Sequence, residues 1–561
     1  MSGLSKLQWL SAGNNKLTSL TLPSNSVFYY LSCDGNQLTS LNLTGVPALK
    51  YLYCYENLLT SISFASSTPN LQLVNCSNNK FTTFTLNNRP ALTTLNIKNN
   101  TSLTELRCYD NALTTLNITG NTALKYLDCA PNNNLTAITG LADCKAIEHL
   151  ACYRCALTDL SAVNSMTNLN YLSCEYNKLT SLTITNKSKL TTVYCENNPN
   201  MTTLTVTGNP LLASLYADEC PALTTLYAYS NALANFFVAS NTALKDLRCY
   251  GNANLASIIG IGDCKAIQKF YCYNCALTDL SAVSGMTNID YLSCYGNKLT
   301  SLTVQNKSKL TYLACYNNPS MTSLTVTGNS ALKTLDTKNC TALTSASCYN
   351  NALTTLSVTG NTKMTTLYCY NNQLTSLSLT NCTALKTLYC YKNKISGTGM
   401  NTLVNTLPTR TASNPGTLRV IYNSGENNTM TAAQVTTATN KYWVPKMYNG
   451  STWVDYSATL IGDVDNDGKV NIDDVTALIH YLLTHVATGI NLTNADVDPD
   501  GIINIDDLSA LIGYLLRGGN PASLAISNGE NLLDGNIDEA PSTEQMAPQD
   551  EIKNQVSGAI K

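Results

Sequence analysis

Residues 385–395 read Leu-Lys-Thr-Leu-Tyr-Cys-Tyr-Lys-Asn-Lys-Ile, and this stretch decides the fold. It follows the pattern L-x-x-L-x-C-x-x-N-x-L, which recurs from about residue 4 to residue 395. A short repeated unit of this kind cannot bury its apolar side alone and does so by stacking on its neighbours. The pattern therefore predicts a solenoid, in which the chain grows by adding rungs.

The third apolar slot of the unit is marked by cysteine. Most steps between successive slots are 21 to 23 residues long, and three steps, which begin at Cys76, Cys195 and Cys315, are 32 or 33. The slot is occupied by Cys33, Cys54, Cys76, Cys108, Cys129, Cys152, Cys174, Cys195, Ala228, Cys249, Cys272, Cys294, Cys315, Cys348, Cys369 and Cys390, which gives about 16 rungs. Rungs about 4.8 Å apart would stack these thiols as a buried ladder of reduced cysteines.

The unit resembles the leucine-rich-repeat consensus, with Cys or Asn in its turn position. Cys152/Cys155 and Cys272/Cys275 have the spacing of redox or zinc motifs. The alternative that we favour is that Cys155 and Cys275 occupy the Asn position of the repeat and bond the turn backbone. The Thr-rich segments between the core slots lack helical periodicity, so we expect short strand or turn there. The fold class is a β-rich leucine-rich-repeat solenoid with few helices.

A longer period lies above the rung. Residues 129–208 match 249–328 at an offset of 120, and the long steps fall at about the same offset. The segments around Leu157 and Leu277 resemble internalin-type rungs, and the Thr-rich segments resemble surface repeats of Bacteroidetes. The resemblance covers residues 1–395, which we take as the solenoid.

Tyrosine follows the core slot in many rungs. Residues beside an inward slot point outward on a strand, so these rings should form a stripe on one concave face. From residue 228 onward the stripe holds Tyr229, Tyr250, Tyr273, Tyr295, Tyr316, Tyr349, Tyr370 and Tyr391. Tyr is enriched at binding hot spots and also stacks on sugar rings, which predicts a ligand face for a protein or a glycan. The alternative is a structural ladder of good strand formers.

The repeat pattern stops after Cys390. Residues 396–460 predict a short helix near Met400, a strand from Leu418 to Tyr422 and a second helix over 431–440. We expect this segment to cap the apolar edge of the last rung.

Residues 463–474 and 496–507 are two acidic loops with Gly at the sixth position. Calcium binds six to eight oxygens, and carboxylates at positions 1, 3 and 5 converge when Gly permits the sharp turn. The expected ligands of two calcium ions are Asp463, Asp465, Asp467, Lys469 through its carbonyl, Asn471 and Asp474 for the first, and Asp496, Asp498, Asp500, Ile502 through its carbonyl, Asn504 and Asp507 for the second.

Each loop leads into an amphipathic stretch with apolar residues at helical spacing. The expected inward residues are Val475, Leu478, Ile479, Leu482 and Leu483, then Leu508, Leu511, Ile512, Leu515 and Leu516. Two Asp-terminated loops, each with one exiting helix, resemble a type I dockerin over residues 461–518. This resemblance implies a cohesin-like partner, bound through Ile472, Asp473, His480, Tyr481, Ile505, Asp506 and Tyr514. These residues differ from the Ser-Thr and Lys-Arg pairs of cellulosomal dockerins. The other interpretation is a calcium-stabilised appendage without a partner.

Composition excludes some function classes. The net charge of −2 and the 12% of charged residues give no general attraction to nucleic acid or anionic membrane. No stretch has the apolar length of a membrane-spanning helix. We expect no signal or anchor segment in this sequence, and we expect residues before Met1 to be missing. Residues 519–561 are expected to be a flexible tail.

Three functions compete. The leading hypothesis is a non-enzymatic, extracellular or cell-surface bacterial protein for binding or adhesion. The others are a structural spacer with a calcium-stabilised appendage and a non-catalytic subunit of a polysaccharide-degrading complex. An enzyme is not expected, because His149, His480 and His485 fit no catalytic triad.

Overall fold

The computed structural model describes residues 4–422, 426–456, 462–465, 470–498 and 500–516. The predicted tail, 519–561, lies outside these residues. The chain divides into two compact units, Met1–Ala458 and Thr459–Lys561. No helix within the described ranges is long and apolar enough to cross a membrane.

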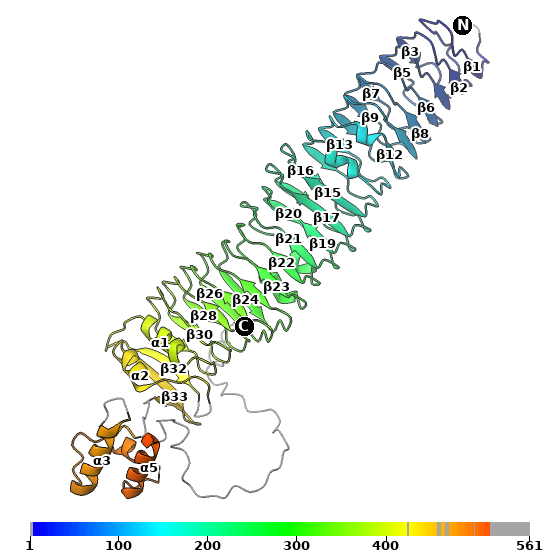
Figure 1. Ribbon diagram of the computed structural model, residues 1–561. Coiled ribbons are helices and arrows are strands. Elements are labelled where there is room, and N and C mark those ends of the chain that lie inside the picture. Colours follow the sequence, from blue (N-terminus) through cyan, green and yellow to red (C-terminus); the bar gives the residue numbers. More distant parts are fainter. Residues whose placement is uncertain (1–3, 423–425, 457–461, 466–469, 499, 517–561) are drawn as a thin grey trace, which may run out of the picture. The chain divides into compact units, whose positions relative to one another are not determined.

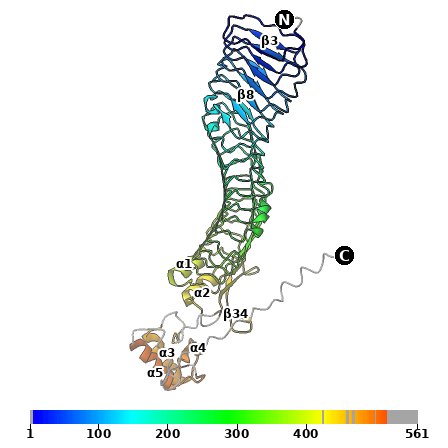
Figure 2. The same ribbon diagram turned by 90° about the vertical axis from the view of Figure 1, so that its right-hand side faces the viewer.

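The first unit is a parallel β-solenoid, elongated and twisted along its length (Figures 1 and 2). Each turn contributes a strand to each of two opposite faces, which we call the first and second face. The first face holds one sheet of β1 (Trp9–Ser11), β2 (Tyr30–Ser32), β4 (Tyr51–Tyr53), β6 (Leu73–Asn75), β8 (Thr94–Asn96), β10 (Thr115–Asn117) and β12 (Ile138–Thr139). A later sheet on this face holds β15 (Ser181–Thr185), β17 (Thr203–Thr207), β19 (Thr225–Tyr227), β21 (Asp246–Arg248), β22 (Lys269–Tyr271), β23 (Tyr291–Ser293), β25 (Tyr312–Ala314), β27 (Thr334–Asp336) and β29 (Thr355–Ser357).

The second face is built in the same way. Its first strands are the pair β3 (Ser40–Leu43) and β5 (Ser61–Phe64), followed by the sheet β7 (Thr83–Thr85), β9 (Glu105–Arg107), β11 (Tyr126–Asp128), β13 (His149–Ala151), β14 (Tyr171–Ser173), β16 (Thr192–Tyr194), β18 (Ser214–Tyr216) and β20 (Asn235–Phe237). Its last sheet is β24 (Ser301–Gln305), β26 (Ser323–Thr327), β28 (Ser345–Ser347), β30 (Thr366–Tyr368), β31 (Thr387–Tyr389), β32 (Gly416–Ile421), β33 (Trp443–Tyr448) and β34 (Trp453–Asp455).

Short 3-10 helices replace strands between the two sheets of each face. On the first face they are η1 (Leu141–Asp143) and η2 (Ser161–Ser165), and on the second face η3 (Ile261–Asp263) and η4 (Ser281–Gly285). The second pair follows the first by 120 residues. The internal duplication seen in the sequence is therefore a structural duplication as well.

The repeat's apolar slots form one continuous core. Leu292 and Cys294 of one rung, for example, are fully buried, as are the corresponding residues of its neighbours. All 22 cysteines are buried, which confirms the prediction of inward thiols, and none of them is joined in a disulfide. Cys155 and Cys275 are in the turn position, where each Sγ lies within hydrogen-bonding distance of backbone carbonyls, as in the interpretation that we favoured.

Asparagine holds the turns between rungs. Asn297 Nδ2 donates to the carbonyls of Cys272 and Cys294 at 2.9 Å, and its Oδ1 accepts from Leu277 N at 3.0 Å. Each such side chain ties its own turn to the preceding rung and satisfies backbone groups that would otherwise be buried without partners.

The predicted single Cys–Tyr face is wrong. Cys76 follows β6 on the first face, whereas Cys108 follows β9 on the second. Each long step therefore contains one and a half turns, and the rung in between has Ile97 in the slot. Four ordinary turns and one long step make the 120-residue block five and a half turns long. Each copy of the block consequently begins on the face opposite to that of the copy before it.

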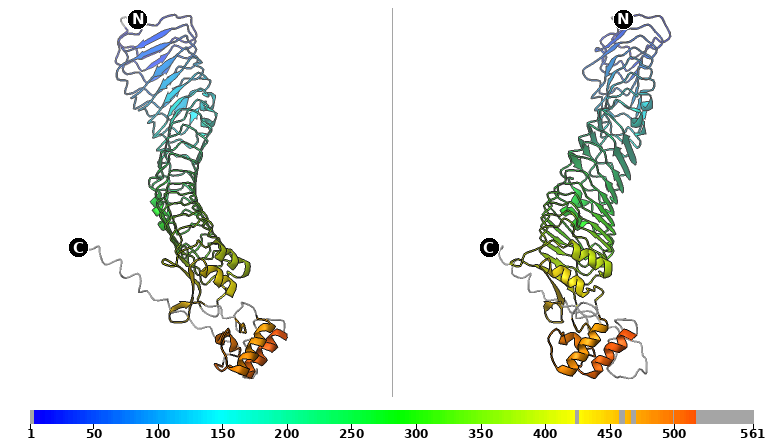
Figure 3. Two further views of the ribbon diagram at one scale, coloured as in Figure 1. Left: turned by 90° about the vertical axis from the view of Figure 1, so that its left-hand side faces the viewer. Right: turned by 60° about the vertical axis from the view of Figure 1, so that its left-hand side comes forward.

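The solenoid ends in α1 (Gly397–Thr406), β32, α2 (Ala432–Thr439), β33 and β34, with the helices seen beside the last rungs in Figure 3. Trp443 is fully buried, and its indole N–H donates to the carbonyl of Pro408 at 2.7 Å. Its ring lies against Gly416, where a Cβ would come within 2.4 Å of the indole. This packing joins the terminal strands to the core of the last rung.

The second unit contains α3 (Ile472–Thr484), α4 (Leu492–Ala495) and α5 (Ile505–Leu516). Val464, Val475, Leu478, Ala495, Val497 and Leu511 form its small core. The predicted inward stripe is wider than the observed one, because Ile479, Leu483, Ile512 and Leu516 are exposed. Because this unit has only two principal helices, only the i, i+3 and i+7 positions of each predicted apolar stripe are covered by a neighbouring element.

Candidate calcium module and aromatic surfaces

The two acidic loops bring carboxylates together. Ligand oxygens of Asp463, Asp465 and Asp474 lie within 4.8 Å of one another, and those of Asp496, Asp498 and Asp500 form a second such group. Of the other predicted ligands, Asp467 and Lys469 lie outside the described residues. Both clusters have the oxygen donors that calcium prefers.

The twelfth residue of each loop organises the loop backbone. Asp474 is fully buried, and its carboxylate accepts N–H bonds from Val464 at 2.7 Å, Asp465 at 3.2 Å and Asn471 at 2.7 Å. In the second loop the buried Asp507 does the same for Val497, Asp498 and Asn504 at 2.5, 3.2 and 2.8 Å. Asn471 and Asn504 accept N–H bonds at the starts of α3 and α5.

Several carboxylates in these loops have buried oxygens without hydrogen bonds from described residues, or lie close to other carboxylates. A bound cation would compensate both. Oδ1 of Asp496 and Oδ1 of Asp498 are shielded from solvent and accept no hydrogen bond from a described residue. Burial, and then the Asp507 and Asp500 carboxylates, raise the pKa of Asp498. Burial likewise raises the pKa of Asp474. The donor set and these unsatisfied oxygens fit a hard cation.

The expected partner-binding residues of this unit are divided between its surface and its interior. Ile472 and Ile505 are 68% and 63% exposed, and Asp473, Asp506 and His480 are also exposed, while Tyr481 is half-buried. Tyr514 is only 8% exposed. It lies one helical turn after the buried Leu511, on the inward side of α5, and its predicted partner contact is therefore wrong. Ile479, Leu483, Ile512 and Leu516 are the exposed apolar residues that the sequence pattern assigned to the core.

The predicted tyrosine stripe is two stacks on opposite faces. Five rings on the first face lie parallel, with centroid distances of 4.4–4.5 Å: Tyr229, Tyr250, Tyr273, Tyr295 and Tyr316. Lys338 occupies the next rung, with Nζ 5.6 Å from the Tyr316 centroid. Tyr349, Tyr370 and Tyr391 stack at 4.5 and 4.6 Å on the second face. The stripe is neither continuous nor confined to one concave face.

The stacking covers ring faces. Interplanar angles of 5–11° in the five-ring stack place each internal ring between two others, so its edge and hydroxyl are the parts left for a ligand. Burial, followed by the neighbouring Tyr250 and Tyr295, raises the pKa of Tyr273 to about 12. The Tyr273 hydroxyl therefore stays protonated at neutral pH. A sugar ring cannot stack on an internal tyrosine of this array.

Two further aromatic stacks lie on the second face. His149 stacks between Tyr126 and Tyr171 at 4.4 Å, and Tyr194, Tyr216 and Phe237 form a separate stack at 4.5 Å, with a tilted contact of 5.9 Å between Tyr171 and Tyr194. Burial, and then Arg107, lower the pKa of His149. The aromatics of the first stack lie three residues before the core slot and those of the second stack one residue before it, so aligning the rungs at these two positions reveals both.

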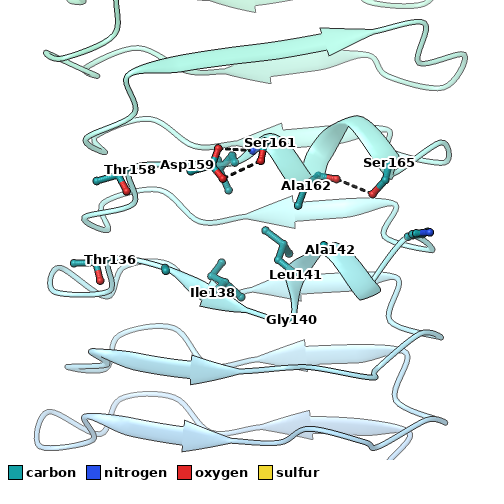
Figure 4. A pocket seen from close by; sticks show the side chains of 13 residues that line it. Thr136, Ile138, Gly140, Leu141, Ala142, Thr158, Asp159, Ser161, Ala162 and Ser165 are labelled. Carbon is teal, nitrogen blue, oxygen red and sulfur yellow. Dashed lines mark hydrogen bonds between the residues drawn. The ribbon is translucent and has the colours of Figure 1, made fainter.

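A cavity of about 580 Å³ lies beside η1 and η2 (Figure 4). Its Asp159 carboxylate accepts from Ser161 N at 2.9 Å and from Ser161 Oγ at 2.8 Å, and Ser165 Oγ donates to the carbonyl of Ala162. The same Asp–Ser bonding recurs at Asp279 and Ser281 beside η4. These groups serve the 3-10 turns.

Comparison with protein families identifies both parts of the chain. Residues 461–516 match the model of the type I dockerin domain, and residues 362–399 match that of leucine-rich repeats in two copies. The chain thus combines leucine-rich repeats with a type I dockerin domain. Type I dockerin domains bind calcium and imply a cohesin partner, and proteins that contain them are typically extracellular or cell-surface. Both kinds of domain are typically non-catalytic. No curated relative matches the chain.

Solved structures with similar repeats come from several bacteria. The functional domain of InlJ from Listeria monocytogenes, which includes a cysteine ladder, is 25% identical over 61% of this chain and 75% of that one, with a TM-score of 0.23. YopM from Yersinia enterocolitica WA-314 is 20% identical over 70% and 84%, with a TM-score of 0.19. At TM-scores of this size the likeness bears on no question of function.

Proposed function

We propose that this protein is a non-enzymatic binding component of a bacterial cell-surface or secreted assembly. The dockerin domain attaches it to a cohesin-type protein, and the solenoid presents its aromatic stacks to a ligand. The observation that carries the proposal is the duplicated pair of acidic loops with exposed apolar residues at equivalent positions, Ile472 and Ile505.

Two calcium ions are proposed, one in each loop. Asp463, Asp465, Asp467 and Asp474, with Asn471 and the Lys469 carbonyl, would hold the first. The second would be held by Asp496, Asp498, Asp500 and Asp507, with Asn504 and the Ile502 carbonyl. The convergence of carboxylates at 4.8 Å or less in each loop supports this assignment.

The proposed cohesin surface uses α3 and α5 and the ends of the loops. It consists of Ile472, Asp473, His480 and Tyr481 in one half and of Ile505 and Asp506 in the other. We add the exposed Ile479, Leu483, Ile512 and Leu516, because apolar side chains with this exposure favour a protein contact. Tyr514 is omitted, since it is buried.

The experiment that tests this function is capture of purified cohesin domains by the full calcium-loaded chain. Ile472→Asp with Ile505→Asp should abolish capture, because a charge then replaces an apolar contact in both halves. Asp159→Asn, which lies in the solenoid, should capture normally. If no cohesin binds the parent chain while its dockerin domain is folded and calcium-loaded, the spacer interpretation replaces this one.

A further inference from the structure

Positive charge collects at the C-terminal end of the solenoid. Residues 340–456 contain eight Lys and Arg residues and two acidic residues, a net charge of +6, in a chain whose overall net charge is −2. The acidic dockerin loops offset this charge in the total, so composition alone conceals it. Local charge of one sign attracts a ligand of the other.

Seven of these eight cations form no ion pair within the described residues. They include Lys386, Lys392, Lys394 and Arg419, whereas Lys446 pairs with Asp455. The other acid, Glu426, directs its carboxylate to the backbone N–H groups of Lys392 and Tyr422. The Glu426 carboxylate also interacts electrostatically with Lys392, so the positive charge of this region is compensated only in part.

Arg419 is held in place with no acceptor for its Nε among the described residues. Its guanidinium carbon lies 4.2 Å from the Tyr389 ring centroid and 4.9 Å from that of Trp453. Its Nε is shielded from solvent and donates no hydrogen bond to a described residue. An arginine oriented by two rings and left with an unused donor is suited to bind a carboxylate.

Polar groups adjoin two of these cations, Lys392 and Lys394. A cavity of about 310 Å³ between the last rungs is lined by Asn371, Gln373, Lys392, Lys394, Tyr422 and Glu426. Lys392 Nζ lies 3.7 Å from the Tyr422 centroid. Amides and a phenol hydroxyl can both donate to and accept from hydroxyl groups, which are the polar groups of a sugar.

We propose that the second face at β30 to β33 binds a linear, uronic-acid-containing polysaccharide. Lys386, Lys392, Lys394 and Arg419 would pair with carboxylates on the polymer, and the neighbouring amides and tyrosine hydroxyls would bond its sugar hydroxyls. The proposal rests on the binding role proposed above and specifies the chemistry of one ligand.

The geometry favours this polymer over a nucleic acid. Single-stranded nucleic acids bind through bases stacked on open aromatic faces. Here Tyr370 lies between Tyr349 and Tyr391 at 4.5 and 4.6 Å, and Tyr422 lies between Tyr391 and Tyr448 at 5.6 and 4.9 Å. The faces of these rings are thus occupied by other rings. A polymer that offers carboxylates and hydroxyls needs no open ring face.

The test is calorimetric titration of the full calcium-loaded chain with a short galacturonic acid oligomer at low and physiological salt. We expect binding that weakens with salt, and much weaker binding of a neutral galactose oligomer. Lys386→Gln with Lys392→Gln and Lys394→Gln should reduce affinity for the acidic oligomer about tenfold or more, since several charge-assisted bonds are lost. Arg419→Gln is a second, independent variant with the same expected direction.

The matched control is Lys178→Gln with Lys298→Gln and Lys309→Gln. Lys178 and Lys298 occupy the same rung position as Lys394, and all three control lysines are exposed. This variant should bind the acidic oligomer normally. Melting temperatures of all variants exclude loss of fold.

The proposal is overturned if the acidic oligomer does not bind at low salt or binds the folded triple variant unchanged. It is also overturned if single-stranded DNA binds as tightly and loses affinity equally in that variant, which would define a general polyanion surface. Cohesin capture by the same samples is a separate readout. If cohesin capture persists while the polysaccharide proposal fails, the proposed function still holds.

Discussion

At the scale of single residues, the repeat assigns each side chain its environment. Cys249, Cys272 and Cys294 occupy the inward slot and are fully buried. Burial raises the pKa of each thiol well above its ordinary value, because the thiolate is poorly stabilised in apolar surroundings. Cysteine in this slot behaves as a small apolar residue, and its abundance carries no redox meaning.

Native alkylation should therefore label few of the cysteines. We expect Cys249, Cys272 and Cys294 to stay unmodified in the folded chain and to react fully after denaturation, as measured by mass spectrometry. Rapid labelling of these three in the native protein would contradict the inward assignment.

Glu196 should make stability depend on pH. Burial, and then the Glu175, Asp218 and Glu219 carboxylates, raise its pKa from 4.5 to about 7. A raised carboxyl pKa means that the folded state binds the proton more tightly, so stability is greatest below pH 4.5 and falls as the pH rises through 7. Glu196→Gln should remove this loss and be more stable at pH 8 by about 1 kcal/mol, after allowance for partial exposure.

The measurement is thermal unfolding of both proteins at pH 5 and pH 8. The difference in melting temperature should appear mainly at pH 8. Glu56→Gln, at an exposed turn, is the control and should show no pH-dependent gain. An equal difference at both pH values would mean that the substitution acts through packing and not through ionisation.

At the scale of elements, the sequence predicted the strand of each rung and short strand on its opposite side, but not that the core slot changes face along the chain. The L-x-x-L-x-C pattern correctly located strands such as β23 and β31. Side chains alternate between inward and outward along a strand, so the inward residues produce a recognisable pattern in the sequence. The Thr-rich segments were expected as strand or turn, and several, such as β24, are full strands of a second face. A step of one and a half turns cannot be recognised from the sequence when only one slot in each turn is considered.

The dockerin helices show a similar limit. Helical periodicity correctly gave Val475, Leu478 and Leu511 as core residues. It also assigned Leu483 and Leu516 to the core, although they are 79% and 82% exposed. Periodicity identifies an apolar side, but the width of that side that is buried depends on how many elements pack against it. With two main helices the covered strip is narrow.

The loops before α3 and α5 should need calcium to keep their structure. Asp474 and Asp507 hold the loop backbones, and the remaining carboxylates converge where only a cation balances their repulsion. Chelation with EGTA should make residues 461–516 of the full chain sensitive to limited proteolysis, while the solenoid stays resistant. Mass spectrometry of the fragments locates the cuts.

Asp474→Ala should reproduce this sensitivity even with calcium present, because it removes a proposed ligand and the acceptor of three loop N–H groups. Asp473→Ala is the adjacent control, since that side chain is exposed. If residues 461–516 resist proteolysis both in EGTA and in the Asp474→Ala variant, the helices fold without metal.

At the scale of the whole solenoid, the duplicated block explains where the aromatic stacks lie. Because a block holds five and a half turns, the same Tyr-bearing segment appears first on one face and then on the other. The sequence showed the tyrosines and their spacing, but not this alternation, which depends on counting half-turns. Each face therefore carries a tyrosine stack, and the two stacks come from related segments of the duplicated block.

Because the two tyrosine stacks lie on opposite faces, a variant of one stack can serve as the control for a variant of the other. Tyr250→Ala with Tyr273→Ala and Tyr295→Ala removes the centre of the first-face stack, and Tyr349→Ala with Tyr370→Ala and Tyr391→Ala removes the second-face stack. If the first-face stack binds a partner protein isolated with the full chain, the first variant should lose most affinity, since truncating one hot-spot aromatic costs about 2 kcal/mol, or roughly thirtyfold. The second variant should leave first-face binding intact, because its rings lie on a different sheet.

Both variants should remain folded, because the rings project from the sheets and the leucine and cysteine core is untouched. Each lost ring pair is worth about 0.5–1.5 kcal/mol, so a lower melting temperature is expected in both. Thr303→Ala, on the face opposite the five-ring stack, should change neither binding nor melting appreciably. If the folded first-face variant binds every partner at full affinity, the stack stabilises the sheet only. The ligand surface must then lie among the second-face aromatics or on the basic end of the solenoid.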